Sequence, residues 1–196
     1  MTRSAHIKRS TRETDIDLKL CIDGSGKARI RTGVPFLDHM LVLWTVHGLF
    51  DLDIEATGDI EIDDHHTVED VGICLGLAFR DAMSDPKGIT RYGSAVIPMD
   101  EALVQVDLDL SRRPFLYYDV PLPSGKIGTF DAELVEEFLR AFAMNAGITI
   151  HIKLLHGKNG HHICEAVFKA LGRALDQATT IDKRRADAIP SSKGAL

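Results

Sequence analysis

The stretch His65-His66-Thr67-Val68-Glu69 returns later in the chain as His161-His162-Ile163-Cys164-Glu165. Each copy runs directly into apolar residues at helical spacing, so each is expected to begin a helix. Positions i and i+4 share one face of a helix, which lets the first histidine and the glutamate of each copy contact one cation. The doubled motif indicates a chain with an internal duplication.

The second histidine of each copy points in a different direction. On a helix, His66 and His162 are turned by about 100° from the residue before them, toward another ion. Each motif is therefore expected to contribute ligands to two different metal ions. Imidazole and carboxylate ligands suit Mn, Fe or Zn better than a thiolate-rich structural zinc site. Cys164 lies inside the second copy, but Val68 fills the matching position in the first, so this thiol is not expected to be a ligand.

The repeat extends beyond the motifs. Aligning the strand-like segments 52–55 and 150–153, with a small adjustment before the second motif, places His39 over Glu137, and both are metal-ligand types. A pseudo-twofold arrangement then predicts one site with His65, Glu69, His162 and Glu137, and a second with His161, Glu165, His66 and His39.

The isolated histidines have an ordinary interpretation. His6, His47, His151 and His156 are expected to be satisfied polar residues, and His151 alternates with apolar neighbours as a solvent-facing strand residue would. The paired motifs have no such packing rationale, because buried ionisable groups cost free energy unless they are paired or coordinated.

Composition limits the classes of protein. The 196 residues suffice for one domain or two closely packed repeats. A net charge of −6 without a basic block argues against nucleic-acid binding. Three widely spaced cysteines indicate free thiols in a reducing compartment. The first residues lack the apolar segment of a secretory signal, and no apolar run could span a membrane, so a cytoplasmic protein is expected.

Periodicity predicts an α+β fold with similar halves. In the first half, strands are expected at 16–22, 28–31 and 50–54, and helices at 35–49 and from 65, the latter capped by Asp64 and ending before the breaker at 85–88. In the second half, strands are expected at 102–110, 115–120 and 148–155 and helices at 131–145 and 161–178, with Gly147 as a left-handed stop.

The expected organisation is a first repeat over 1–90, a second repeat over 91–180 packed with it as one unit, and a tail over 181–196. The tail is polar and basic, which usually indicates disorder. Its end, Ile189 to Gly194, combines hydroxyls, a lysine and a glycine, which favours a phosphate-binding segment instead.

Six short sequence motifs follow one another along the chain: Arg12-Glu13-Thr14, Phe36 to Met40, Asp63 to Asp70, Asp109 to Pro114, Gly157 to His162 and Ile189 to Gly194. In that order they make essentially the whole chain resemble the imidazoleglycerol-phosphate dehydratase family of histidine biosynthesis. The resemblance implies that each repeat is a mixed four-stranded sheet with two helices on one face, like the second domain of ribosomal protein S5. It also implies a homo-oligomer of 24 subunits, with two Mn ions per active site at subunit contacts.

The resemblance also implies roles for individual residues. Glu13 is the candidate proton carrier, and Glu137 stands where some members have a histidine ligand. The first metal would have His39, His66, His161 and Glu165, and the second His65, Glu69 and His162. Substrate and phosphate contacts would come from Arg91, Arg113, Lys169, Ser191, Ser192 and Lys193; for Arg91 and Lys169 a solvated surface charge is the alternative.

The implied reaction removes water from D-erythro-imidazoleglycerol phosphate to give imidazole acetol phosphate. The departing hydrogen is on a carbon without an adjacent carbonyl, so the substrate ring, bound as imidazolate between two cations, would supply the electrons that expel hydroxide. Glu13 would then remove the carbon proton, with His65, Glu69, His161 and Glu165 completing the catalytic set. Two alternatives remain: a dinuclear metallohydrolase with the same ligands, and a non-catalytic metal-binding shell protein.

Overall fold

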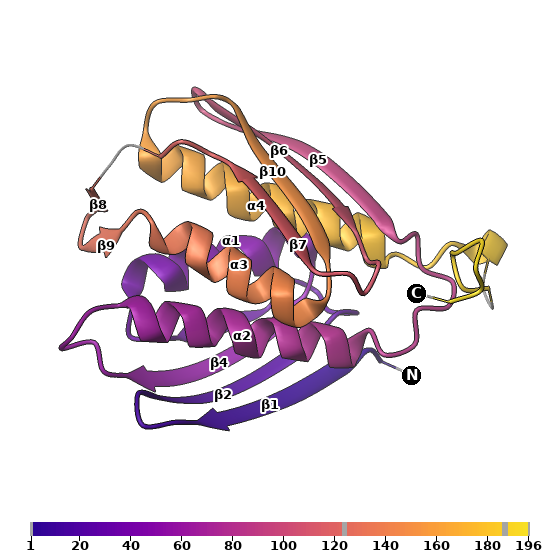
Figure 1. Ribbon diagram of the computed structural model, residues 1–196, viewed down its shortest axis with the longest axis horizontal. Coiled ribbons are helices and arrows are strands. Elements are labelled where there is room, and N and C mark those ends of the chain that lie inside the picture. The colour runs from indigo at the N-terminus through magenta and orange to yellow at the C-terminus, as the bar shows by residue number, and fades with distance from the viewer. Residues whose placement is uncertain (1, 123–124, 186–187, 196) are drawn as a thin grey trace.

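The structure is a computed structural model that describes residues 2–122, 125–185 and 188–195. In this part of the chain, two four-stranded sheets enclose a layer of four α-helices (Figure 1). The first sheet has the order β1-β2-β4-β3 and the second β5-β6-β10-β7. The strands are β1 Ser4–Ser10, β2 Thr14–Cys21, β3 Ala28–Arg31, β4 Asp51–Gly58, β5 Tyr92–Met99, β6 Ala102–Asp109, β7 Phe115–Asp119 and β10 Thr149–His156.

The helices join the two halves into one core. They are α1 Pro35–Gly48, α2 His65–Ala82, α3 Leu134–Ala146 and α4 Gly160–Thr179. Helices α1 and α2 lie on the first sheet and α3 and α4 on the second, while α1 packs on α4 and α2 on α3. Alternate residues of β2 (Ile16, Leu18 and Leu20) are buried beneath this layer. Burial of apolar surface between the repeats therefore stabilises both together.

Strand pairing repeats with the same register in the two sheets. In the first, Leu52 of β4 pairs with Leu20 on the antiparallel side and with Ala28 on the parallel side. In the second, Ile150 of β10 pairs in the same way with Leu108 and Leu116. The internal duplication is thus present at the level of individual residue pairs, and both sheets are mixed, as expected.

Two glycines mark equivalent close contacts between helices. A Cβ at Gly76 on α2 would lie 2.7 Å from the carbonyl oxygen of Phe142, and a Cβ at Gly172 on α4 would lie 2.6 Å from that of Trp44. Both pairs of helices therefore approach each other too closely for a side chain at these positions. Trp44 and Phe142 follow His39 and Glu137 at the same spacing, so the helix packing has the register predicted by the sequence alignment.

Several predicted boundaries were wrong. The periodicity analysis missed β1 and β5, the outer strands that complete each sheet. It also placed the start of α3 at Asp131, where the structure has the short strand pair β8 Lys126–Ile127 and β9 Phe130–Asp131. Asp64 occupies the N-cap of α2 without a side-chain hydrogen bond, and Asp63 instead accepts from the backbone N–H of His65 at 2.8 Å.

The predicted end of α3 is confirmed. Gly147 ends α3 in the left-handed conformation with φ of 71°. The tail forms a short 3-10 helix, η1 Lys183–Arg185, and bonds back to the body where the backbone N–H of Gly88 donates to the carbonyl of Ala188 at 2.9 Å. Over the described ranges, none of the helices has the length and apolar character needed to cross a membrane.

Candidate active site

The two motif helices, α2 and α4, begin at the same end of the molecule, on the left in Figure 1. Here His39 of α1 meets the second motif. Oε1 of Glu165 lies 3.1 Å from Nε2 of His39 and 3.1 Å from Nε2 of His161. The ligand atoms of these three residues lie within 4.8 Å of one another, close enough to hold one metal ion.

Lys169 lies behind this cluster, one helical turn after Glu165. Its Nζ donates to Oε2 of Glu165 at 2.6 Å and is only slightly exposed. Burial raises the pKa of Glu165, but hydrogen bonds from Lys169 and His39 outweigh it and lower the pKa to about 2. An ionised carboxylate with two imidazole nitrogens is a donor set that suits a divalent transition metal. Lys169 is therefore part of the cluster and not a solvated charge.

The first motif forms a looser pair. Nε2 of His65 lies 4.0 Å from Oε2 of Glu69, as the i,i+4 spacing predicts, and both side chains are exposed. Glu137 is only half-buried on α3, and within the described residues it forms no ion pair with His65. In the described part of the chain, the first motif thus lacks the third side chain that His39 provides for the second motif. The role of Glu137 as a metal ligand stays a prediction.

The second histidines are turned away from their motif glutamates, as helical geometry predicts. Nδ1 of His66 lies 2.9 Å from the carboxylate of Asp59, and Nε2 lies 3.9 Å from Glu13. Nδ1 of His162 lies 2.7 Å from Oε2 of Glu101. These hydrogen bonds to carboxylates raise the pKa of both histidines. Neither histidine joins the cluster at His39 within one chain, although the sequence placed His66 there.

Asp59 and Glu101 were missed by the sequence analysis. The repeat register could have identified Glu101. This residue lies in the turn between β5 and β6, at the position equivalent to that of Glu13 in the turn between β1 and β2. Seeing this requires both outer strands, which periodicity did not reveal. The Glu13 turn is fixed by Thr11, whose Oγ1 accepts from the backbone N–H of Glu13 at 3.1 Å.

The predicted phosphate contacts form a separate group at the other end of the molecule. Arg91 donates to both carboxylate oxygens of Asp109, at 2.7 and 3.0 Å, and to the carbonyl of Pro190 at 2.8 Å. The Arg91 side chain is therefore fixed by hydrogen bonds and is not a solvated surface charge. Arg113 lies 3.8 Å from the same aspartate. A surface pocket of about 490 Å³ lies beside them, lined by Arg91, Tyr92, Arg185, Ala188, Ile189, Pro190, Ser191 and Ser192.

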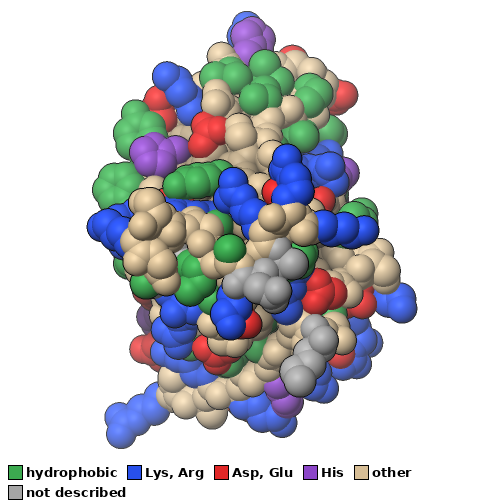
Figure 2. All heavy atoms as spheres, turned by 90° about the vertical axis from the view of Figure 1, so that its right-hand side faces the viewer, with side chains coloured by type: hydrophobic (Ala, Val, Ile, Leu, Met, Phe, Trp, Pro, Cys, Tyr) green, Lys and Arg blue, Asp and Glu red, His purple; other side chains and the backbone are tan. Residues whose placement is uncertain are grey.

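Figure 2 looks onto this end and shows lysine and arginine side chains gathered around the tail. Ser191 and Ser192 line the pocket, and the backbone N–H of Lys193 donates to Oγ of Ser191 at 3.2 Å. The backbone N–H of Arg91 donates to the carbonyl of Ala178 at the end of α4, whereas His161 lies at its start. A rise of 1.5 Å per residue separates the two groups by about 25 Å. One chain therefore does not bring its metal-type ligands and its phosphate-type residues together.

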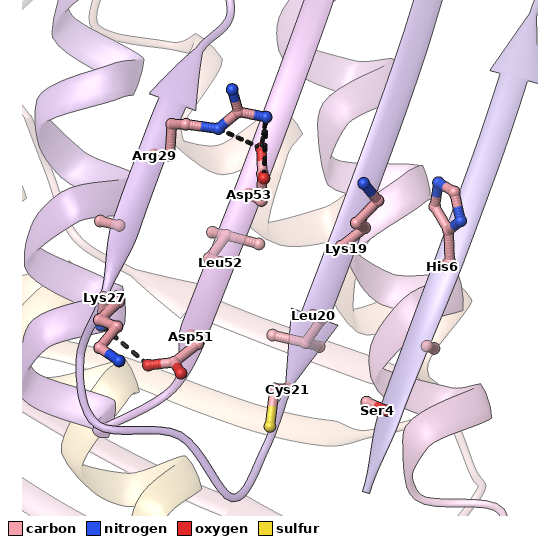
Figure 3. A pocket seen from close by; sticks show the side chains of 12 residues that line it. Ser4, His6, Lys19, Leu20, Cys21, Lys27, Arg29, Asp51, Leu52 and Asp53 are labelled. Atoms are coloured by element: carbon pink, nitrogen blue, oxygen red, sulfur yellow. Dashed lines mark hydrogen bonds and ion pairs between the residues drawn. The ribbon is translucent and has the colours of Figure 1, made fainter.

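A further hollow, of about 640 Å³, lies on the outer face of the first sheet and is lined by none of the candidate site residues. Some of its charged side chains are engaged, as Figure 3 shows: Arg29 donates to Asp53 at 2.9 Å, and Asp51 accepts from the backbone N–H of Lys27 at 3.0 Å. His6 also lines it and lies 2.6 Å from Asp17, in keeping with an ordinary polar residue. We assign this surface no part in the site.

The fold and these side-chain groups define a class of duplicated α+β proteins with histidine and carboxylate side chains gathered at the N-terminal ends of their motif helices. The family model of imidazoleglycerol-phosphate dehydratase matches residues 32–175. The chain belongs to the imidazoleglycerol-phosphate dehydratase family, and the protein is accordingly an enzyme, a dehydratase of the lyase class in histidine biosynthesis.

Relatives of that name match throughout their length. The chain is 61% identical over 196 residues to the protein from Trichlorobacter lovleyi, covering 100% of both chains. It is 60% identical over 194 residues to the one from Syntrophobacter fumaroxidans, covering 99% of this chain and 98% of the relative.

Solved structures of imidazoleglycerol-phosphate dehydratase have the same fold. The Staphylococcus aureus enzyme is 44% identical with a TM-score of 0.83, over 91% of this chain and 99% of that chain. The Pyrococcus furiosus enzyme, in complex with (S)-C348, is 41% identical with a TM-score of 0.83, over 97% of this chain and 100% of that chain. These similarities confirm the predicted fold class of two mixed four-stranded sheets with helices.

Proposed function

We propose that the protein converts D-erythro-imidazoleglycerol phosphate to imidazole acetol phosphate and water, with two Mn ions per active site. The observation that carries this proposal is the cluster of His39, His161 and Glu165 in a chain of this family. A non-catalytic metal-binding shell has no use for the separate pocket of Arg91 and the tail serines, which suits a phosphorylated substrate.

The donor chemistry of the site fits two metal ions. His39, His66, His161 and Glu165 would hold the first, and His65, Glu69 and His162 the second, with Glu137 as a further candidate. The carboxylate of Glu165 is ionised, and carboxylates beside Nδ1 of His66 and His162 leave Nε2 as the ligand atom. When bound, the ions would supply Lewis acidity that holds the substrate ring as imidazolate and stabilises negative charge.

The protein's own groups divide the remaining work. Glu13, exposed at the metal end, is the base that takes the proton from carbon. Lys169 supplies a positive charge beside Glu165 and is the candidate contact for a polar group of the substrate. Arg91, Arg113, Ser191, Ser192 and Lys193 hold the phosphate, which fixes the position of the reacting carbon.

Separation of the two groups within one chain supports a homo-oligomer. Since about 25 Å of α4 lies between them, the metal end of one copy would be completed by the tail of another copy. We propose the 24-subunit assembly implied by the family resemblance, with active sites at subunit contacts. The partners are then further copies of the chain and the small phosphorylated imidazole substrate, without nucleic acid or membrane. The three free thiols agree with a cytoplasmic location.

The test is Mn-dependent product formation measured alongside native mass. Protein treated with a chelator should be inactive, and added Mn should restore imidazole acetol phosphate formation in a species of 24 subunits. Release of inorganic phosphate from the substrate would favour the metallohydrolase. Many more than two bound ions per chain, without product, would favour the metal-binding shell.

A further inference from the structure

Glu101 lies in the turn between β5 and β6 and contacts the start of α4 through both carboxylate oxygens. Oε2 lies 2.7 Å from Nδ1 of His162. Oε1 accepts from the backbone N–H of Asn159 at 2.8 Å and from that of Lys158 at 3.3 Å. Each oxygen therefore has its own donors, and the side chain is fixed in direction.

An ionised carboxylate only accepts hydrogen bonds, so Nδ1 of His162 must carry the proton that it donates to Glu101. A neutral imidazole protonated at Nδ1 has its lone pair at Nε2. Metal-binding histidines commonly have this arrangement, in which a carboxylate fixes the tautomer and the ring orientation. In the other half, Asp59 is placed in the same way against Nδ1 of His66, at 2.9 Å.

The two halves reach this arrangement from different positions. Glu101 is the internal counterpart of Glu13, since both follow the first strand of their sheet in the same register. The counterpart of Asp59, which follows β4, is Lys158, because a bulge between Leu154 and His156 brings Gly157 of the second half to the place of Gly58. A lysine side chain has no atom that could accept a hydrogen bond from Nδ1 of His162. In the second half the turn glutamate therefore contacts the histidine. In the first half Asp59 does so, and Glu13 stays 3.9 Å from Nε2 of His66.

We propose that Glu101 is a positioning residue that holds His162 in its metal-binding tautomer, and that Asp59 does the same for His66. This inference rests on the proposed function, because it assigns both histidines to metal. It also explains how a pseudo-symmetric site contains one base: of two counterpart glutamates, Glu101 is engaged with a ligand and Glu13 faces the substrate.

The substitution Glu101→Gln tests this with little change of shape. Glutamine has only one acceptor oxygen. The two backbone N–H groups that donate to Glu101 in the loop before α4 would hold this oxygen on their side. Its NH₂ group then faces Nδ1 of His162 and donates to it, which moves the ring proton to Nε2 and blocks ligation. Loss of such a partner typically weakens metal binding about 10- to 100-fold.

The measurement is Mn affinity, by competition with a chelating indicator dye, on chelator-treated full-length protein. Glu101→Gln should bind one ion, the one that His162 would hold, about 10- to 100-fold less tightly than the natural chain. The matched control is Glu13→Gln, the same change at the counterpart position, which should leave affinity within about twofold because Glu13 does not hold Nδ1 of a ligand. Thermal unfolding of the metal-free forms shows whether both variants keep their fold.

Unchanged Mn affinity in a folded Glu101→Gln variant overturns the proposal, as does an equal loss in both glutamine variants. If Glu101→Gln does not fold, Asp59→Ala provides the same test at His66, with the same expected loss and the same refuting result. The outcome is independent of turnover: an affinity loss in a protein that forms no imidazole acetol phosphate would support the positioning role while refuting the proposed reaction.

Discussion

Replacing Gly172 with alanine forces a methyl group into the contact between α4 and α1. Its Cβ would lie 2.6 Å from the carbonyl oxygen of Trp44 and 3.1 Å from the backbone nitrogen of Gly48, both of them main-chain atoms that cannot rotate away. Gly76→Ala makes the same intrusion between α2 and α3, at 2.7 Å from the carbonyl oxygen of Phe142.

The expected loss of stability is the difference between two effects. Inserting a methyl group into a packed contact costs about 1–3 kcal/mol, and the backbone contacts favour the upper half of that range. Replacing a glycine inside a helix by alanine returns about 1 kcal/mol of helix propensity. Each variant should therefore unfold with about 1–2 kcal/mol less free energy. Because the two contacts join different pairs of helices, the double variant should lose about 2–4 kcal/mol, the sum of both.

Urea unfolding of chelator-treated protein, followed by circular dichroism, measures these free energies. Asp81→Ala, at an exposed position of α2, is the control and should stay within about 0.5 kcal/mol of the natural chain. Two single variants as stable as the natural chain would show that the helices do not approach this closely. A loss at one glycine and none at the other would contradict the equivalence of the two contacts.

Three further results are expected. Glu13→Gln should keep its bound metal, by elemental analysis, while turnover falls about 10²- to 10⁴-fold, the usual contribution of a general base; full activity would exclude Glu13 from that role. His65→Ala and His161→Ala should each retain about one of two ions, because each removes a ligand of a different metal; two ions in either variant would contradict the assignment of ligands. A thiol reagent should modify Cys21 in the native protein and all three cysteines only after unfolding, since burial raises the pKa of the thiols on α2 and α4 to about 11 and about 12; three equally fast reactions would refute that burial.

The contacts within the motifs were predictable because helical geometry is local. The spacing of His161 and Glu165 is enough to place them on one face, and the structure brings them to 3.1 Å. The repeat register added His39, which lies far from the motif in sequence yet joins it in the fold. A duplicated sequence supplies such long-range information because the second copy shows which segments belong together.

The outer strands could not be recognised in the same way. In β1, alternate residues are only half-buried, so the sequence shows no clear apolar alternation. In β5, Gly93 and Pro98 interrupt the pattern, although both are tolerated in a strand at the edge of a sheet. The turns that follow these strands contain Glu13 and Glu101, and the pairing of Glu101 with His162 therefore depended on tertiary structure.

Separation of the metal end from the tail has a genetic consequence under the proposed shared site. A chain with a damaged ligand, such as His161→Ala, keeps an intact tail, and a chain with a damaged tail, such as Ser191→Ala, keeps intact ligands. In a mixed assembly some contacts join the intact end of one chain to the intact end of the other. Two inactive alleles expressed in one cell should then complement each other, whereas two alleles damaged at the same end should not.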